Sequence, residues 1–217
     1  MLALLRPSVA RNLLCSVCLL GSLLSFAKPS SAEVLWKIAP GRTSIQFKVK
    51  HLLLMEVEGR FEDYDGTVIT PDETDFSNAK VEATIPVKSI YTGNDDRDSH
   101  LLQDAFFHVV KFPDMTFHST RVVRKPDGQF EMEGNLTIRG VSRPITLAVV
   151  HEGTKRSAAG KLRSSFKATG SLNRYDYGLR WNDVTEAGRM LVGDTVQIEM
   201  DVTLVENGET SRVASAQ

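Results

Sequence analysis

Apolar and polar side chains alternate with a period of two residues along most of the chain between residues 43 and 205. Near the start of this region Ile45, Phe47 and Val49 alternate with polar residues, and the same pattern recurs at 196–204. Successive side chains of a β-strand point to opposite faces, so each segment has one apolar and one polar face. The pattern predicts an antiparallel sheet, because strands of parallel sheets are apolar on both faces.

Turn-forming sequences separate the alternating segments. Pro126-Asp127-Gly128 and the run 140–144 each join two of them, and Gly, Pro and Asp favour tight turns. Long amphipathic strands in this number form either a sandwich or a closed barrel. Strands of about 9 to 11 residues span roughly 30 Å, which is long for a small sandwich. We therefore predict an all-β fold, a closed antiparallel barrel of about eight strands. They are expected at 43–51, 55–70, 78–90, 114–124, 129–139, 144–152, 161–172 and 194–205.

One short helix is predicted near 94–103. Asn94 or Asp95 can accept hydrogen bonds from the free amides of its first turn. Asp96 and Asp98 lie near the positive end of the helix dipole, where carboxylates are stabilising. The helix is therefore expected to begin at this acidic run.

Small residues occupy several inward positions of the predicted strands, namely Ala83, Gly134, Ser164, Ala168 and Gly170. Barrels of eight strands are either filled by side chains or hold one small ligand. Missing side-chain volume on the inner face favours a lumen that the protein leaves unfilled. The alternative is that Gly134 and Gly170 mark bulges or tight curvature.

The first 32 residues have the three-part pattern of an export signal. Basic Arg6 and Arg11 precede an apolar run at 12–26, and small residues lead up to Ala32. The apolar run is short of the roughly 20 residues that a membrane span needs. We expect a signal peptide at 1–32, cleaved after Ala32, and a mature protein in the periplasm. An uncleaved membrane anchor is the alternative.

One domain is expected at 33–205, followed by a mobile tail at 206–217 that lacks hydrophobic periodicity. Both cysteines, Cys15 and Cys18, fall in the signal, so the mature protein is expected to have no disulfide, thiol nucleophile or cysteine-bound zinc. The 217 residues include 26 basic and 27 acidic side chains. Because nucleic-acid binding needs clustered basic residues, we predict no nucleic-acid partner.

A run of charged and aromatic residues at 96–120 begins Asp96-Arg-Asp-Ser-His100 and ends Phe117-His-Ser-Thr120. With further segments it covers about 35–205, and the combination resembles the YceI-like family of exported lipid-binding proteins. Ala39-Pro40 departs from the Asp-Pro that is frequent in this family, which removes a turn-capping carboxylate but leaves the lumen untouched. The further segments are Trp36, Ser44 to His51, Val57 to Phe61, Asp65-Gly66, Ser89 to Gly93, Gly134 to Leu147 and Asn173 to Gly178.

The resemblance implies a lipocalin-like barrel that holds a polyisoprenoid chain, of an isoprenoid quinone or a polyprenyl lipid, for transport or storage. We expect no cofactor and no enzymatic activity. An extended prenyl tail needs a long and narrow apolar site, in agreement with the predicted interior. For each wall position plain core packing is the alternative role. The candidate lumen residues are Ile45, Phe47, Val49, Val81, Ala83, Ile85, Met115, Phe117, Leu136, Ile138, Phe166, Ala168, Ile198, Met200 and Val202.

Polar residues near strand ends are candidates for the mouth of the barrel, where a headgroup would lie. A solvated ion pair is the alternative role for those at 174–177. Phe106, Phe107 and Phe112 follow the helix, where they either close one end of the barrel or attach the helix to the sheet. We expect transient contact with a membrane, and a monomer or homodimer. The mouth candidates are Arg97, His100, Arg174, Asp176 and Tyr177.

Two other functions fit parts of the sequence. A metal-dependent or other hydrolase would use the Asp and His residues at 95–118, but the spacing of His100, His108 and His118 matches no zinc-site pattern, so no metal site is predicted. Helix capping also explains the aspartates. A barrel with a filled interior would instead serve as an interaction module. Metal analysis with a His100→Ala variant, and the presence of an internal void, separate these alternatives from lipid binding.

Overall fold

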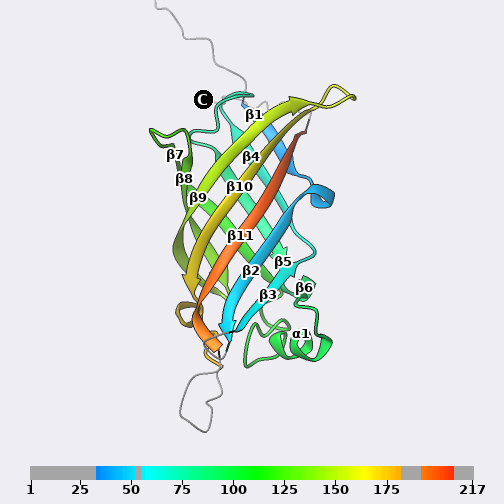
Figure 1. The fold of residues 1–217 in the computed structure, drawn as a ribbon, viewed down its shortest axis with the longest axis vertical. Helices are drawn as coiled ribbons and strands as arrows, with labels where there is room; N and C mark the ends of the chain where they lie inside the picture. The colour runs from blue at the N-terminus through cyan, green and yellow to red at the C-terminus, as the bar shows by residue number, and fades with distance from the viewer. Residues whose placement is uncertain (1–32, 52–54, 182–191, 208–217) are drawn as a thin grey trace, which may run out of the picture. The chain divides into compact units, whose positions relative to one another are not determined.

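The computed structural model of the protein describes residues 33–51, 55–181 and 192–207. In these ranges eleven strands form one antiparallel sheet in the order β1-β4-β5-β7-β8-β9-β10-β11-β2-β3-β6. Pairing of β1 with β11 closes the sheet into a barrel, as Figure 1 shows. The predicted all-β closed barrel is therefore confirmed. The strands are β1 (Val34–Ile38), β2 (Ser44–His51), β3 (Met55–Phe61), β4 (Asp65–Thr70), β5 (Lys80–Pro86), β6 (Ile90–Tyr91), β7 (Asp114–Arg124), β8 (Phe130–Ile138), β9 (Val141–Arg156), β10 (Leu162–Asn173) and β11 (Val192–Glu206).

Eight strands form the closed ring, while β2, β3 and β6 continue the wall beyond short interruptions. The interruptions lie at one level of the barrel. The hydroxyl of Tyr64 lies 2.8 Å from the carbonyl oxygen of Pro40, and the amide of Glu62 donates to the carbonyl of Ser89 at 2.9 Å. The predicted strands at 55–70 and 78–90 are thus each broken by a bend in the wall. The interruptions are η1 (Pro40–Arg42), residues 62–64 and η2 (Val87–Ser89).

Two other strand predictions differ from the structure. The sequence did not indicate β1, because apolar Leu35 lies on the outward phase between Val34 and Trp36 and blurs the alternation. Strand β9 extends at both ends beyond the predicted 144–152. Its extension passes through a bulge opposite the Ser165/Phe166 step, where Gly153 has a φ of 129°. A glycine that resembles a strand end therefore marks a bulge within the strand.

The short helix α1 (Asp95–Leu101) forms where it was predicted, although it ends at Leu101 instead of at residue 103. The side-chain oxygen of Asn94 accepts a 2.9 Å hydrogen bond from the amide of Arg97, which is the expected N-cap. The predicted signal peptide at 1–32 lies outside the described residues, as does the predicted tail from residue 208 onward. Strand β11 runs to Glu206, one position past its predicted end.

The inward glycines leave less free space than the sequence indicated. A Cβ at position 134 would overlap the ring of Phe117, and one at position 170 would meet Leu147 Cδ2 at 2.5 Å. These neighbours fill the volume that the glycines leave, so the expectation of unfilled space at both positions is wrong. The bulge between Ser119 and Arg121 lies opposite Gly134, which fits the alternative role in curvature.

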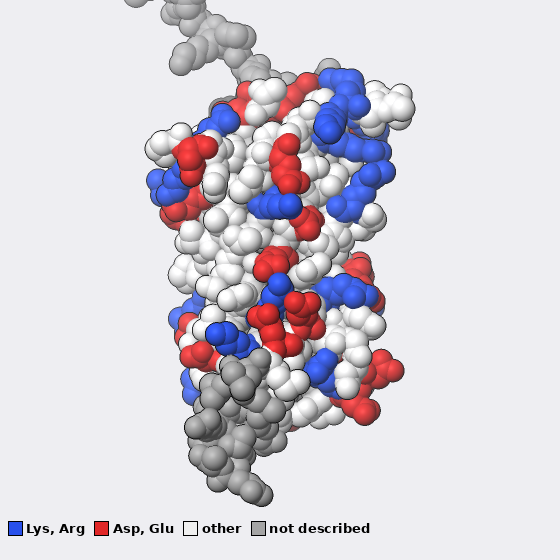
Figure 2. All heavy atoms as spheres, viewed as in Figure 1, with Lys and Arg blue, Asp and Glu red and all other residues white. Residues whose placement is uncertain are grey.

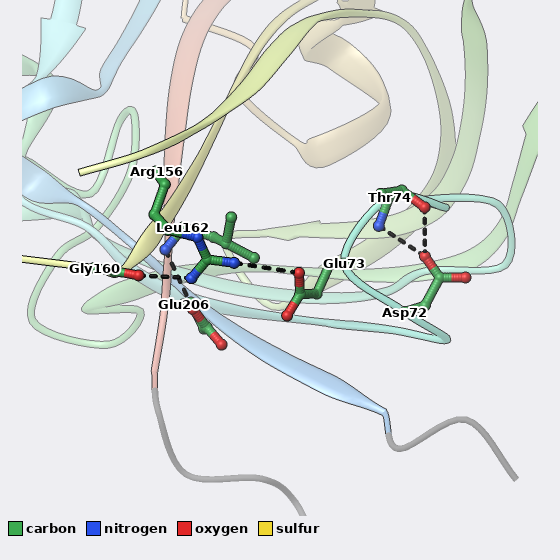
Figure 3. Close-up of polar contacts among 7 residues, drawn as sticks. All are labelled: Asp72, Glu73, Thr74, Arg156, Gly160, Leu162 and Glu206. Carbon is green, nitrogen blue, oxygen red and sulfur yellow. Dashed lines mark hydrogen bonds and ion pairs between the residues drawn. The ribbon is translucent and has the colours of Figure 1, made fainter.

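One end of the barrel is covered by the β4–β5 connection at 71–79. Figure 3 shows how polar contacts fix this connection and its surroundings. Oδ1 of Asp72 accepts hydrogen bonds from the amides of Thr74 and Asp75 at 2.7 and 2.8 Å. From β9, Arg156 reaches Glu73 at 3.6 Å and donates to the carbonyl of Gly160 at 2.7 Å. These bonds hold the connection across the barrel end.

The outer wall carries charged side chains of both signs. Lys48 lies between Glu58 and Glu199, with Nζ to carboxylate distances of 3.6 and 3.3 Å. On the face drawn in Figure 2 basic and acidic groups are interspersed among uncharged ones. In the described part of the chain no helix has the length and hydropathy of a membrane-crossing segment. The outer face is thus polar where the alternation predicted polar positions.

Candidate functional site

A cavity of about 750 Å³ runs inside the barrel, and its wall is formed almost entirely by aliphatic and aromatic side chains. All the predicted lumen residues line it. Whether they contact a ligand stays a prediction, but the alternating pattern placed them on the correct face. They are Ile45, Phe47, Val49, Val81, Ala83, Ile85, Met115, Phe117, Leu136, Ile138, Phe166, Ala168, Ile198, Met200 and Val202.

The cavity has a closed end under the 71–79 connection. Phe76 from this connection lines the cavity and is only 4% exposed. Its ring lies 4.8 Å from that of Phe166 and 5.5 Å from that of Trp36, measured between centroids. The aromatic cluster separates the apolar interior from solvent at this end.

A small polar group adjoins the closed end. Nε2 of His151 lies 2.8 Å from Oγ of Ser164 and 3.2 Å from Oγ1 of Thr154. The imidazole stacks on the ring of Phe166 at 4.7 Å and 21°. Burial lowers the pKa of His151, and the nearby charge of Arg124 lowers it further. The neutral imidazole is therefore the form that this packing favours.

The other end of the cavity is its mouth, which we define by Met55, Arg97, His100 and Trp181. Met55 lines the cavity although the residue is 61% exposed, so the interior reaches solvent there. Helix α1 supplies Arg97 and His100, and it lies beside the β3 and β6 strands in Figure 1. The predicted placement of Arg97 and His100 at an opening of the barrel agrees with this geometry.

Three rings form an aromatic cluster at the mouth. The centroid of His100 lies 5.1 Å from that of Phe106 and 5.0 Å from that of Trp181, and the last two are 5.0 Å apart. All three residues line the cavity. Phe107 also lines it, whereas Phe112 packs against Gly140. Phe106 and Phe107 therefore fit the predicted role at the end of the barrel, and Phe112 fits the predicted attachment to the sheet.

Arg97 is held in place by Thr92. Its Nε donates to Oγ1 of Thr92 at 2.7 Å and its Nη2 donates to the carbonyl of Thr92 at 2.8 Å. The carboxylate of Asp98 accepts from the Thr92 amide at 3.0 Å and from the Thr92 hydroxyl at 2.5 Å. Two hydrogen bonds to one threonine therefore fix the guanidinium at the mouth.

Arg174 has a structural role beside the cavity. It is 4% exposed, and its guanidinium donates to the carbonyls of Leu179, Trp181 and Gly193 at 2.5, 2.9 and 2.7 Å. Burial lowers the pKa of Arg174, although an arginine keeps its proton at any ordinary pH. Its donors fix the backbone around Trp181, so we assign it to supporting the mouth.

Two mouth candidates lie away from the cavity. Asp176 is exposed on η3 (Arg174–Tyr177), and Tyr177 is 2% exposed within the apolar core. Neither lines the cavity. The helical turn of η3 rotates successive side chains by about a third of a turn, so residues 174–177 point in different directions and only Arg174 lines the cavity.

The Asp and His residues at 95–118 do not converge on one point. Asp98 bonds to Thr92, His100 packs against aromatic rings, and His118 faces Glu82 on the outer wall at 3.8 Å. Among the described residues no group of three or more His, Cys, Asp and Glu side chains is placed to hold a metal ion. The geometry thus supplies no assembled site for the hydrolase alternative in this region.

Besides strand residues on inward phases, such as Phe61 and Leu147, the sequence reasoning missed Phe76 and Trp181, which lie at opposite ends of the cavity. Both belong to connections between strands, where a period of two carries no information on side-chain direction. Trp181 could have been noticed as a large aromatic residue in a segment otherwise rich in polar residues. Phe76 carries the same signal, as the one aromatic residue of the polar segment 71–80.

Known proteins with similar sequences and structures agree with this geometry. The YceI-like domain family matches residues 36–204. A UPF0312 protein of Staphylococcus aureus (strain bovine RF122) is 34% identical over 158 residues, 72% of this chain and 89% of its own length. The crystal structure of a Campylobacter jejuni YCEI protein is 32% identical, covers 73% of this chain and 90% of its own, and has a TM-score of 0.60.

A third relative shares the fold at low sequence identity. It is a polyisoprenoid-binding domain from Saccharophagus degradans implicated in plant cell wall breakdown. The match covers 80% of this chain and 99% of that domain, with a TM-score of 0.56 and 14% identity. At this identity the similarity concerns the barrel architecture.

Proposed function

The chain belongs to the YceI-like family, and from that premise we propose that it is an exported protein that binds a polyisoprenoid chain in its lumen. The observation that carries this proposal is the apolar cavity of about 750 Å³, which a barrel filled by its own side chains would lack. The polyisoprenoid-binding domain with the same fold supports the ligand class. The protein acts by binding, for transport or storage, and needs no catalytic group.

Burial of the hydrocarbon supplies the affinity. Each CH₂ group removed from water contributes about 0.8 kcal/mol, and ordering the flexible chain offsets part of that gain. Because apolar contacts are not directional, a wall of aliphatic side chains tolerates ligands of different length. Specificity for the headgroup must come from the few polar groups at the mouth.

The charges at the mouth favour a headgroup of low net charge. Among the described residues, basic Lys50, Arg97 and Arg174 line this end together with acidic Glu56 and Asp96, so the two signs nearly balance. A diphosphate would need several uncompensated cations. The aromatic cluster of His100, Phe106 and Trp181 instead offers ring faces, to which a planar headgroup such as a quinone can pack.

Ligand orientation can be tested with the two tryptophans of the chain. Trp181 lies at the mouth, whereas Trp36 is fully buried behind the closed end. A Trp36→Phe variant reports on Trp181 alone, and a Trp181→Phe variant reports on Trp36 alone. Titration with a prenylated benzoquinone is expected to quench the fluorescence of Trp181 more strongly. Equal quenching in both variants, or no saturable quenching in either, would reject this orientation.

Export to the periplasm is also part of the proposal. The basic, apolar and small-residue segments at 1–32 support it. Cell fractionation followed by N-terminal sequencing of the purified protein tests it. The expected result is a chain that begins at Glu33 in the periplasmic fraction. A chain that retains Met1, or that stays with the membrane, would contradict cleavage after Ala32.

A further inference from the structure

The ring of Phe47 lies against a glycine on the inner wall. Phe47 of β2 and Gly59 of β3 are cross-strand partners on adjacent strands (Figure 1). A methyl group at position 59 would stand 2.8 and 2.9 Å from Cε1 and Cε2 of Phe47, and closer still to Cζ. Carbon atoms normally approach to about 3.5–4.0 Å. The ring therefore occupies the place that a side chain at position 59 would take.

This arrangement keeps the ring out of the lumen. Phe47 lines the cavity, and the sheet lies directly behind its ring. The centroid of the Phe47 ring also lies 5.7 Å from that of Phe61. The Phe61 ring in turn lies 6.5 Å from that of Phe107. A ring displaced from the wall cannot move into the sheet, so it would move into the lumen on the mouth side of the cavity.

Gly59 differs from the other inward glycines in one respect. The three nearest atoms to a Cβ at position 59 all belong to the far end of the Phe47 side chain. At Gly134 the carbonyl oxygen of His118 would also lie 2.7 Å away, so a methyl group there would strain the backbone. A substitution at Gly59 thus changes the position of one ring and little else.

We propose that Phe47, seated on Gly59, determines ligand specificity by setting the width of the lumen, so that it admits methyl-branched chains. The proposal rests on the proposed function, since it concerns the same cavity. With the ring seated, there is room for the side methyl groups that distinguish a polyisoprenoid from an unbranched chain. With the ring displaced, the passage narrows and branched chains are excluded first.

The test compares phytanol with hexadecanol, two saturated alcohols with main chains of equal length that differ only in methyl branches. Gly59→Ala is expected to weaken phytanol binding roughly tenfold or more, the usual effect of steric exclusion of a methyl group. Hexadecanol binding should fall less. The matched control is Gly41→Ala, because a Cβ at position 41 has no neighbouring atom within 4 Å. That variant should bind both alcohols as the unmodified protein does.

Two further variants change Phe47 itself. In the double variant Gly59→Ala with Phe47→Leu the bulky ring is absent, so phytanol binding should return towards the unmodified level. Phe47→Trp enlarges the ring and leaves the residue at position 59 unchanged. This variant should also weaken phytanol binding more than hexadecanol binding. Circular dichroism and thermal melting verify that each variant is folded.

The outcomes separate this inference from the proposed function. If the unmodified protein binds phytanol, and Gly59→Ala and Phe47→Trp bind both alcohols with unchanged preference, the role of Phe47 is wrong while lipid binding stands. If the unmodified protein binds neither alcohol, the proposed function itself fails. Equal losses for both alcohols in Gly59→Ala would also contradict a selective width limit.

Discussion

Nε1 of Trp36 donates a 2.9 Å hydrogen bond to Oγ1 of Thr70, and the two residues are 0% and 1% exposed. The Thr70 hydroxyl in turn donates to the carbonyl of Asp72 at 2.7 Å. This chain of bonds links β1 to β4 and continues into the connection that covers the closed end. One threonine therefore couples the β1–β4 pair to the connection that carries Phe76, four residues beyond Asp72.

Thr70→Val is expected to destabilise the barrel. Valine has nearly the same shape, but it leaves the buried indole N–H of Trp36 without its partner, which costs about 1–3 kcal/mol. Urea unfolding measures the loss, and Thr70→Ser, which keeps the hydroxyl, should lose less. A Thr70→Val protein as stable as the unmodified one would show that the bond contributes nothing.

Arg174→Lys is expected to lower stability although it conserves the charge. A lysine has three donors on a flexible stem and cannot reproduce the planar fork that reaches Leu179, Trp181 and Gly193. Orphaned buried carbonyls cost about 1–3 kcal/mol. Arg143→Lys is the control, because exposed Arg143 makes one long bond of 3.4 Å; a change within about 0.5 kcal/mol is expected there. Equal effects of the two variants would contradict the structural role.

The protonation of His151 is expected to make the free energy of unfolding depend on pH. Its pKa is lowered in the folded state by burial and by Arg124, whereas in the unfolded chain it has the ordinary value of about 6.5. The unfolded state therefore binds the proton more readily, and stability decreases as the pH falls below about 6.5. His151→Gln should flatten this dependence between pH 7 and 5, measured by urea unfolding.

The control for that measurement is His118→Gln, on the outer wall, where the side chain is 59% exposed. This variant should keep the pH dependence of the unmodified protein. If His151→Gln keeps it as well, other groups are responsible for the acid sensitivity, and the packing of neutral His151 against Phe166 has no measurable effect.

Ala83→Trp and Ala168→Trp are expected to block ligand uptake while leaving the barrel folded. Both alanines line the cavity, so an indole at either position fills the lumen. Ala148→Trp is the matched control, because Ala148 lies on the exposed outer face of β9. Uptake of a prenyl alcohol by each purified variant is the measurement. Undiminished uptake by both lumen variants would place the ligand elsewhere.

The sequence was sufficient to predict the inward face of the strand residues named as lumen candidates. A period of two assigns every strand position to one of two faces, so residues such as Phe47 and Ile198 could be placed without coordinates. Local capping rules likewise predicted Asn94 as the start of the helix. Both inferences depend only on neighbours along the chain.

The free volume of the lumen could not be predicted in the same way. Gly134 and Gly170 lack side-chain volume, but the rotamers of Phe117 and Leu147 fill that space. The mouth was harder still, because Trp181 and Tyr177 lie outside regular strands. Tertiary packing, which brings together residues distant in sequence, determines both features.

Lipid extraction from the native protein tests the central claim most directly. The protein should be purified from its own host without detergent, extracted with organic solvent and analysed by mass spectrometry, with Ala83→Trp purified in parallel as the blocked control. We expect a polyisoprenoid from the unmodified protein and little or none from the variant. An unmodified protein that yields no polyisoprenoid, or one that yields the same lipids as the blocked variant, would contradict the account.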